Sequence, residues 1–292
     1  MPDDWSDKTT CRLLNQGLIQ KGICLLLGAA DTGKTTLAAA IARHTASCRP
    51  VAIIDADVGQ SHIGPPTTVG WTVVDNPPAD LSQLTAAGIS FVGDVTPAGH
   101  LLQLTAAIAQ CVRQASEAAD LIIIDTPGLI HGPAAAALWW TTQRILQPQL
   151  ILAVQRNDEL TDILAGLKSA NLQRLESPPQ IPAKSPQQRR NYRQNRFKSY
   201  FQNSQLYNIK ITDIAVQTTR NLNRNSPVHR LIALRNARDL DLAIGIITDW
   251  QTDKDTVTVK APQLDIRQVR CIVIGDVSIN TSDMSDYGYR FH

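Results

Sequence analysis

The sequence has few cysteines, little net charge and no long apolar run. Its five cysteines are scattered among 292 residues without a C-x-x-C pair, which argues against a structural zinc site and favours a reducing, cytoplasmic location. No stretch approaches the roughly 18 consecutive apolar residues of a membrane helix, so we expect no membrane partner. The first residues, MPDDWSDKTT, lack the pattern of a secretory signal. A net charge of +2 is too small to indicate nucleic-acid binding by itself.

What the sequence does contain is a nucleotide-binding pattern, LLLGAADTGKTTLAAAI, at residues 25–41. Its G-x-x-x-x-G-K-T spacing lies between an apolar run and an alanine-rich helical stretch, which is the strand–loop–helix context of a P-loop. The glycines let backbone N–H groups surround phosphate oxygens at a helix N-terminus. The pattern predicts that Lys34 binds the phosphates of a nucleoside triphosphate and that the Thr35 hydroxyl ligates Mg²⁺. The predicted nucleotide contacts within this loop are Gly28, Asp31, Thr32, Gly33, Lys34, Thr35 and Thr36.

Two later apolar runs end in acidic residues. PVAIIDADVGQ (50–60) leads into Asp55 and Asp57, and DLIIIDTPGL (120–129) leads into Asp125. Carboxylates at the carboxyl ends of parallel strands face the ligand crevice. One carboxylate can hold a metal through water, and another can accept a proton from an attacking hydroxyl. Asp55 and Asp57, which precede a glycine, also fit a simple turn, and spacing alone leaves both interpretations open.

The order of apolar runs and helical stretches predicts the fold class. Further apolar runs lie at 89–100 and 150–160, and helical stretches at 99–117, 133–146 and 160–172 separate the runs. This alternation predicts an α/β P-loop NTPase with a mostly parallel, doubly wound sheet. Short β-branched runs follow from about residue 209 to 279 and predict a small β-rich C-terminal domain. That domain could orient a nucleic acid or mediate assembly, or it could simply cap the main sheet.

A basic segment, KSPQQRRNYRQNRFKSYF, occupies residues 184–201 and contains no acidic residue. Arg189 and Arg193 are four residues apart, so they share one helix face. Arginines near an ATP site can clamp a transferring phosphoryl group, and they can also bind a phosphate backbone. A solvated basic helix face is the alternative.

Asp125-x-x-Gly128 is also the pattern of a GTPase switch loop. Guanine-specific GTPases normally carry an Asn-Lys-x-Asp motif as well, but residues 155–158 read Gln-Arg-Asn-Asp. The missing pair disfavours guanine specificity. A regulatory GTPase or ATPase remains an alternative function, as does a catalytically silent protein that keeps ATP bound while it works with nucleic acid.

Taken together, these segments resemble the P-loop polynucleotide 5′-hydroxyl kinases, which include eukaryotic RNA-processing kinases of the cleavage-factor and pre-rRNA-processing type and their archaeal and bacterial relatives. The resemblance runs over roughly residues 22–202. A P-loop alone is common to many NTPases, whereas its combination with D-x-D-x-G-Q and an arginine-rich helix is much more specific. The matching segments are GAADTGKTT (28–36), DADVGQ (55–60), PPTTVG (65–70), FVGDVTPAGH (91–100), IIDTPG (123–128) and RRNYRQNRFKSYF (189–201).

The resemblance implies ATP and Mg²⁺ as cofactors, and transfer of the γ-phosphate to the 5′-hydroxyl end of RNA and/or DNA. It implies that Asp57 activates the hydroxyl, with Thr35, Asp55 and Gln60 around the metal. Thr126 and Gly128 would form a clasp over the phosphates. The implied catalytic residues are Lys34, Asp57 and the lid arginines Arg189 and Arg193.

One position departs from the family, because clasps often carry a tryptophan where this chain has Leu129. Trp71, Trp139 or Trp140 could replace it, or could simply pack in the core. His62, His100 and His131 have no metal-like spacing, which favours structural roles.

The resemblance and the change in periodicity together predict the division of the chain. We expect an N-terminal extension at 1–20, a P-loop kinase domain at 21–207 with its lid at about 184–202, a β-rich domain at 208–281 and a frayed polar tail at 282–292.

Overall fold

The computed structural model describes residues 3–75, 80–167, 171–218 and 227–288. At its centre, five parallel strands lie in the order β2-β5-β1-β6-β7. Almost every residue of the first four of these strands is buried, because helices cover both faces of the sheet. The bounds are β1 (Gly22–Leu27), β2 (Val51–Asp55), β5 (Leu121–Asp125), β6 (Leu150–Gln155) and β7 (Leu172–Glu176).

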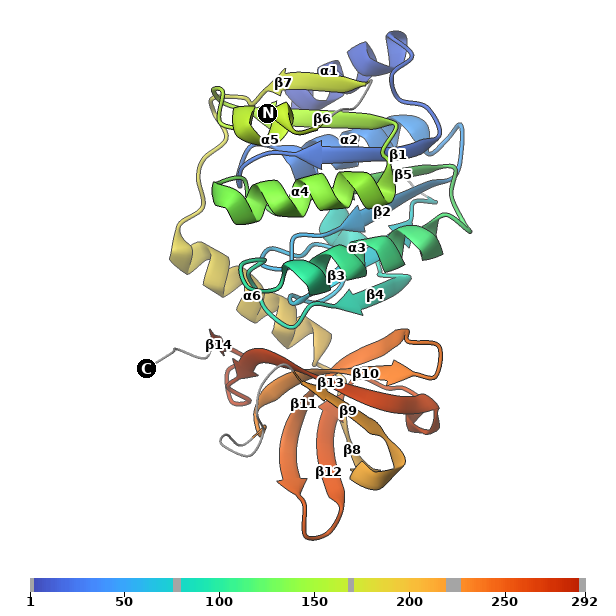
Figure 1. The fold of residues 1–292 in the computed structure, drawn as a ribbon, viewed down its shortest axis with the longest axis vertical. Coiled ribbons are helices and arrows are strands. Elements are labelled where there is room, and N and C mark those ends of the chain that lie inside the picture. The colour runs from blue at the N-terminus through green and yellow to red at the C-terminus, as the bar shows by residue number, and fades with distance from the viewer. Residues whose placement is uncertain (1–2, 76–79, 168–170, 219–226, 289–292) are drawn as a thin grey trace.

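Each face of the parallel sheet has its own helices and its own hydrophobic cluster (Figure 1). One face packs against α1 (Asp3–Asn15) and α2 (Lys34–Thr45). The other packs against α3 (Leu101–Ala115), α4 (Gly132–Leu146) and the short α5 (Thr161–Ala165). The predicted doubly wound α/β fold is therefore confirmed. Of the helix predicted over 160–172, the structure has α5, which ends at Ala165, and Leu172 already belongs to β7; residues 168–170 lie outside the described residues.

The sheet continues beyond β2 in antiparallel fashion. β3 (Thr68–Val73) pairs antiparallel with β2, and β4 (Gly88–Phe91) pairs antiparallel with β3. β3 is not among the strands predicted from the sequence, and β4, which overlaps the run at 89–100, is antiparallel to its neighbour where the alternation predicts a parallel strand. The connection from β2 to β3 contains no crossover helix, so the chain returns in the opposite direction.

The C-terminal region is β-rich, as predicted, and joins the same sheet through β4 and β11 at the pair Ile89–Asp241. Its first strand begins at Gln205, so the predicted boundary at 208 falls inside a strand. The tail is not frayed throughout, because its last strand pairs with the one before it. The strands are β8 (Gln205–Lys210), β9 (Ala215–Thr218), β10 (Arg230–Asn236), β11 (Asp241–Gln251), β12 (Thr256–Ala261), β13 (Val269–Ile279) and β14 (Asp286–Gly288).

Helix α6 (Pro186–Tyr200) runs from the P-loop unit down to the C-terminal strands (Figure 1). Ser185 begins it with a capping box, in which its hydroxyl accepts from the Gln188 N–H and the Gln188 side chain accepts from the Ser185 N–H. The carboxyl end buries Phe197 and Phe201 among residues of β4, β10, β11 and β13. Crossing a bilayer requires a long apolar helix, and none of the helices over the described residues meets that requirement.

Candidate active site

The P-loop turns sharply between β1 and α2. Gly33 precedes α2 at φ +95° and Asp31 lies at φ +58°, both in the left-handed region. A Cβ on Gly28 would clash with the carbonyl oxygen of Val154 on the neighbouring strand. The loop is therefore held in the tight curve that lets backbone N–H groups point at phosphate oxygens.

Lys34 is buried at the start of α2. Its Nζ donates to the carbonyl oxygens of Gly28 at 2.9 Å and Ala29 at 2.7 Å. Burial lowers the pKa of this amine, while the nearby carboxylates of Asp125 and Asp57 oppose the shift. An ammonium group inside the loop's curve is placed to bind phosphate oxygens in exchange for these carbonyls.

Thr35 and Asp125 lie together at the carboxyl end of β5. The Thr35 hydroxyl donates to Asp125 Oδ2 at 2.5 Å. The other oxygen, Oδ1, is buried and has no hydrogen-bond partner among the described residues. Burial raises the pKa of Asp125 to about 6, against the lowering effect of Lys34. A hydroxyl beside a carboxylate with one unsatisfied oxygen is a donor set suited to Mg²⁺.

Asp55 was predicted to contact the metal, but its carboxylate serves the following loop. Its oxygens accept from the backbone N–H groups of Asp57, His62 and Ile63, and its side chain is fully buried. Burial is the main cause that raises its pKa, to about 7, and these N–H donors oppose it. Asp55 does not line the nucleotide cavity described below, so we revise its role to organiser of the loop at 55–63.

Asp57 and Gln60 are better placed than Asp55 to meet a ligand. Asp57 Oδ1 accepts from the N–H groups of Gly59 and Gln60, both at 3.0 Å. The Gln60 amide donates to the carbonyl oxygens of Gly59 and Arg189, whereas its buried Oε1 has no partner within the described part of the chain. The unsatisfied oxygen is a possible ligand for a metal or its water.

The predicted clasp packs directly on the P-loop. A Cβ on Gly128 would lie 2.8 Å from Ala30 Cα, so only glycine allows this close approach. The Thr126 hydroxyl donates to the Leu26 carbonyl at 2.6 Å, which fixes the loop to β1. Thr126 also lines the nucleotide cavity, and it is nearly fully buried.

The amino end of α6 contacts the P-loop. The Arg189 guanidinium donates to Asp31 Oδ2 at 2.5 Å, and the Lys184 N–H donates to the same oxygen at 2.9 Å. Arg189 therefore lies beside the phosphate-binding loop, although 158 residues separate it from Asp31 in the sequence. This contact brings the predicted lid to the predicted nucleotide site.

Arg193 is placed differently. It binds Asp286 of β14, with Nε 3.0 Å from Oδ2, and does not line the nucleotide cavity. Arg196 donates to the carbonyl oxygens of His62 and Gly64, both at 2.7 Å, and so holds α6 against the loop after β2. The structure thus joins Arg189, but not Arg193, to the P-loop.

These groups surround a cavity of about 390 Å³, which we call the nucleotide cavity. Its walls come from the P-loop, the loop after β2, the clasp and the amino end of α6. It also extends along α2 to Ala39 and Arg43, away from the phosphate-binding end. The predicted site residues that line it are Asp31, Thr32, Gly33, Lys34, Thr35, Thr36, Asp57, Gln60, Thr126 and Arg189.

Two residues that were not among the predicted site residues also contribute. His62 lines the cavity with its ring centroid 5.6 Å from that of Tyr192 on α6. Its burial lowers the pKa of the imidazole, while the charges of Asp125 and Asp57 oppose the shift. Arg156, at the position examined for guanine recognition, donates to the Asp31 carbonyl at 2.6 Å. Its position at the end of β6 was the available signal, because strand ends meet at the P-loop.

None of the three candidate tryptophans replaces the clasp residue in the cavity wall. Trp139 is fully buried and donates to the Leu129 carbonyl at 2.7 Å. Trp140 donates to Ile163 O, and Trp71 donates to Gln114 Oε1. The three indoles therefore stabilise packing and loop positions.

Comparison with known proteins agrees with the P-loop nucleotide cavity described above. Residues 28–203 match the model of the family described as mRNA cleavage and polyadenylation factor CLP1 P-loop. A polyribonucleotide 5′-hydroxyl-kinase of Pyrococcus horikoshii is 34% identical over 196 residues, which are 67% of this chain and 54% of the relative. One of Methanocaldococcus jannaschii is 30% identical over 222 residues, 75% of this chain and 60% of the relative. The chain thus spans between half and two thirds of the length of these relatives.

The fold is similar to that of a chain in the solved wild-type Clp1p–Pcf11p complex. The TM-score is 0.73, covering 94% of this chain and 79% of the other at 13% identity. At that identity the likeness bears on the fold alone, and it extends through the C-terminal strands as well as the P-loop unit. The family match covers the P-loop, the loop after β2, the clasp and α6, which are the walls of the nucleotide cavity. This chain belongs to the CLP1 P-loop family.

Proposed function

We propose that this protein is an ATP-dependent polynucleotide 5′-hydroxyl kinase with RNA as its principal substrate. The observation that carries the proposal is the contact between Arg189 and Asp31, which joins an arginine-bearing helix to the phosphate-binding loop. A phosphoryl-transfer site needs cationic groups on two sides of the transferring group, because its charge spreads over three oxygens. The names of the relatives support RNA, since those proteins are polyribonucleotide kinases.

In the proposed reaction, the P-loop N–H groups and Lys34 bind the β- and γ-phosphates of ATP. Asp57 accepts the proton of the 5′-hydroxyl as its oxygen attacks the γ-phosphorus. The bond to the β-phosphate breaks and ADP leaves with the electron pair. Arg189 exchanges its contact with Asp31 for the transferring group, whose charge it neutralises.

Mg²⁺ fits the residues beside Lys34. The unsatisfied oxygens of Asp125 and Gln60 and the hydroxyl of Thr35 provide the oxygen ligands that Mg²⁺ requires. A bound Mg²⁺ supplies charge neutralisation for the β- and γ-phosphates. We therefore replace Asp55 with Asp125 in the proposed metal site and retain Thr35 and Gln60. Arg193 can contact the transferring phosphoryl group only if it leaves Asp286, so its catalytic role stays a prediction.

The choice of nucleotide is part of the proposal. The Arg156 guanidinium donates to the Asp31 carbonyl, so the residue after β6 contacts the P-loop backbone. ATP is the expected donor. The free cysteines Cys11, Cys24, Cys48, Cys111 and Cys271 are in keeping with the proposed cytoplasmic location.

The test is transfer of labelled γ-phosphate from ATP, with GTP in parallel, to 5′-hydroxyl RNA and DNA oligonucleotides of one sequence. We expect transfer to RNA that depends on Mg²⁺ and is abolished in Lys34→Ala. Lys21→Ala is the matched control, since Lys21 is an exposed lysine before the amino end of β1 and does not line the nucleotide cavity.

Each alternative function gives its own result. Hydrolysis of GTP without oligonucleotide phosphorylation would identify a regulatory GTPase. Tight ATP binding without transfer or stimulated hydrolysis would identify a catalytically silent partner protein. Transfer to DNA alone would leave the kinase in place and overturn the proposed preference for RNA.

A further inference from the structure

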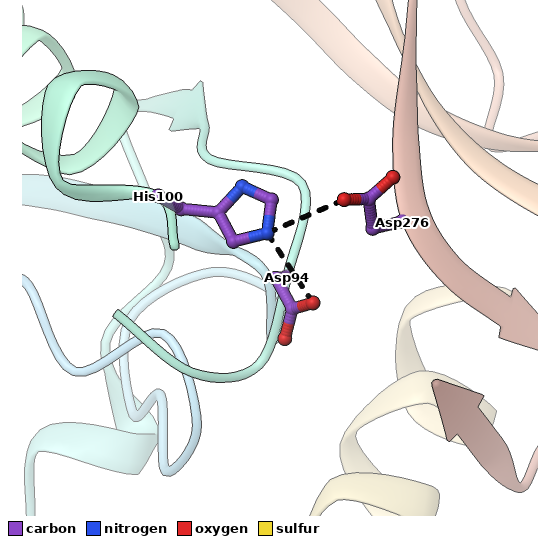
Figure 2. Close-up of side chains that lie close together, drawn as sticks. All are labelled: Asp94, His100 and Asp276. Atoms are coloured by element: carbon purple, nitrogen blue, oxygen red, sulfur yellow. Dashed lines mark ion pairs between the residues drawn. The ribbon is translucent and has the colours of Figure 1, made fainter. Parts of the chain in front are cut away.

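A second group of polar side chains lies outside the nucleotide cavity, where the P-loop unit meets the C-terminal strands. Asp94 follows β4, His100 precedes the first turn of α3, and Asp276 belongs to β13. Figure 2 shows one ring nitrogen of His100 facing the carboxylates of both Asp94 and Asp276. We call these three residues the seam cluster, because they come from the two units that the sheet joins.

The spacing of the three donor atoms is the first observation. His100 Nε2 is 3.4 Å from Asp94 Oδ2 and 3.5 Å from Asp276 Oδ2. Both distances exceed the usual range of about 2.7–3.2 Å for an N–H···O hydrogen bond. Ligands on one tetrahedral zinc ion, with bonds of about 2.0–2.2 Å, lie about 3.3–3.6 Å apart. The two separations from His100 fall in that interval, and all three donors lie within 4.8 Å of one another.

The backbone fixes this spacing before any ion arrives. The Asp276 N–H donates to the Gly93 carbonyl at 2.8 Å, which ties β13 to the residue before Asp94. A Cβ on Gly275 would lie 2.8 Å from that carbonyl oxygen, so glycine is needed for the approach. The Thr96 N–H donates to Asp94 Oδ1 at 2.9 Å and leaves Oδ2 toward the imidazole. Preset ligands reduce the entropy lost on binding a cation.

An open cavity beside the seam cluster is the second observation. Its volume is about 320 Å³, and both His100 and Asp276 line it. The one guanidinium in its described wall belongs to Arg235, which pairs with Asp241 at 2.7 Å. The cavity is large enough for water or a small oxygen ligand to complete the coordination of an ion held by the three side chains.

The geometry points to a divalent transition-metal site of the zinc type formed by Asp94, His100 and Asp276, with a fourth position open to this cavity. One imidazole and two carboxylates suit Zn²⁺ or Co²⁺ better than Mg²⁺, which prefers six oxygens. The ion joins β13 to the P-loop unit. This site is separate from the Mg²⁺ proposed at Thr35 and Asp125 and does not depend on the kinase activity.

The sequence could not reveal this cluster. Asp94 and His100 are near each other in FVGDVTPAGH, but the third ligand lies in the C-terminal region. The three histidines considered earlier showed no metal-like spacing, and that assessment changes for His100 because β13 brings Asp276 to it.

The test uses Co²⁺ as a spectroscopic probe on the full chain after treatment with EDTA. Four- and five-coordinate Co²⁺ absorbs visible light much more strongly than six-coordinate Co²⁺, so a bound ion reports its own geometry. We expect one equivalent of strongly absorbing Co²⁺ that Zn²⁺ displaces. Zn²⁺ should also raise the midpoint of thermal unfolding.

Variants assign the ligands. His100→Ala and Asp94→Asn should each weaken Co²⁺ binding by at least about 100-fold and remove the Zn²⁺-dependent rise in unfolding temperature. His44→Ala is the matched control, because His44 pairs with one carboxylate, Asp7, at 3.0 Å. A Cys11→Ser, Cys48→Ser variant removes the two exposed thiols that could also bind the probe.

The results separate a metal site from a simple ion pair. Loss of the Co²⁺ spectrum in both ligand variants, with retention in both controls, would support the site. If wild type shows no strongly absorbing Co²⁺, or if folded His100→Ala protein binds it equally well, the cluster is an ion pair and the inference is wrong. Circular dichroism establishes whether each variant is folded. If His100→Ala does not fold, the loss or retention of Co²⁺ binding in Asp94→Asn tests the inference.

Discussion

The two ends of α6 contact the rest of the molecule in different ways. At the amino end, Arg189 and Lys184 make polar contacts with one oxygen of Asp31, and Gln60 donates to the Arg189 carbonyl. At the carboxyl end, Phe197 and Phe201 are buried in a hydrophobic cluster. Nearby, the Tyr200 hydroxyl accepts from the Ile244 N–H at 3.0 Å.

The amino end of α6 therefore carries the residue proposed to act on phosphate, and its carboxyl end carries the side chains that anchor the helix. Polar contacts at a rim can be exchanged for phosphate oxygens at small cost, because charged ligands replace charged side chains. Buried aromatic side chains cannot leave without opening a cavity. We therefore expect Arg189 to change partners during turnover while the residues from Phe197 onward stay in place.

The largest expected effect comes from the amino end. Arg189→Ala should lower the rate of phosphate transfer by about 10³–10⁵-fold, the range found for arginines that stabilise a transferring phosphoryl group. The unfolding temperature should change little, since the Arg189 side chain is 27% exposed and solvent screens its ion pair. Single-turnover kinetics with saturating ATP would measure the rate.

Arg190→Ala is the control, because Arg190 is exposed and contacts Gln187 of its own helix. Equal losses for the two variants would mean that general positive charge, rather than the contact at the P-loop, matters. Such a result would contradict the proposal that the two ends of α6 have different roles.

The carboxyl end should show the opposite pattern. Phe197→Ala deletes a fully buried ring and should lower the free energy of unfolding by about 3–5 kcal/mol. Urea unfolding would measure the change, with Lys198→Ala as an exposed neighbour on the same turn. A loss below about 1 kcal/mol, with transfer strongly reduced, would show that this end is not the anchor.

Sequence analysis predicted the elements that depend on local pattern. The P-loop motif and the buried runs of β1, β2, β5 and β6 located the centre of the sheet and the nucleotide cavity. β3 escaped because its residues, TVGWTV, give a short run with a central glycine and no helix before it. Whether such a strand pairs parallel or antiparallel depends on the route of the chain, and the residues themselves do not encode that route.

The same limit explains the choice between Asp55 and Asp125. Both end parallel strands, and they are paired in register across β2 and β5. Sequence alone does not reveal which carboxylate the neighbouring loop will use. The 55–63 loop folds back and gives three N–H donors to Asp55, whereas Asp125 keeps one oxygen unsatisfied beside Thr35. Long-range contacts, rather than strand position, decide which one can face a metal.

A third experiment tests the proposed metal site by pH. Burial raises the pKa of Asp125 to about 6 from an ordinary value of 3.8. Between these values the folded protein keeps a proton that the unfolded chain has released, so this group favours folding less as pH rises from about 4 to about 6. Above about 6 the cost of the buried charge is complete.

Asp125→Asn removes that titration. The free energy of unfolding of the variant, relative to wild type, should increase by an amount on the order of 2 kcal/mol between pH 4 and pH 7. Urea unfolding at several pH values, without nucleotide or Mg²⁺, would measure it. The same scan on Lys198→Ala should run parallel to wild type. Parallel curves for Asp125→Asn as well would show that burial does not penalise this carboxylate.

The smallest expected effect lies at the middle of α6, where Arg193 binds Asp286 with both side chains largely buried. If this pair belongs to the anchor, Arg193→Ala and Asp286→Ala should be non-additive in stability, with a coupling energy of about 1 kcal/mol in a double-mutant cycle. Both variants should then slow phosphate transfer by similar, modest factors, because each loosens the same contact. If Arg193 instead leaves Asp286 to reach ATP, Arg193→Ala should slow transfer far more than Asp286→Ala. The part of α6 that contacts ATP during turnover would then extend from Arg189 to Arg193. The ratio of the two transfer rates decides between these positions even where the stability changes are equal, since a contact made only during turnover leaves the free energy of unfolding untouched.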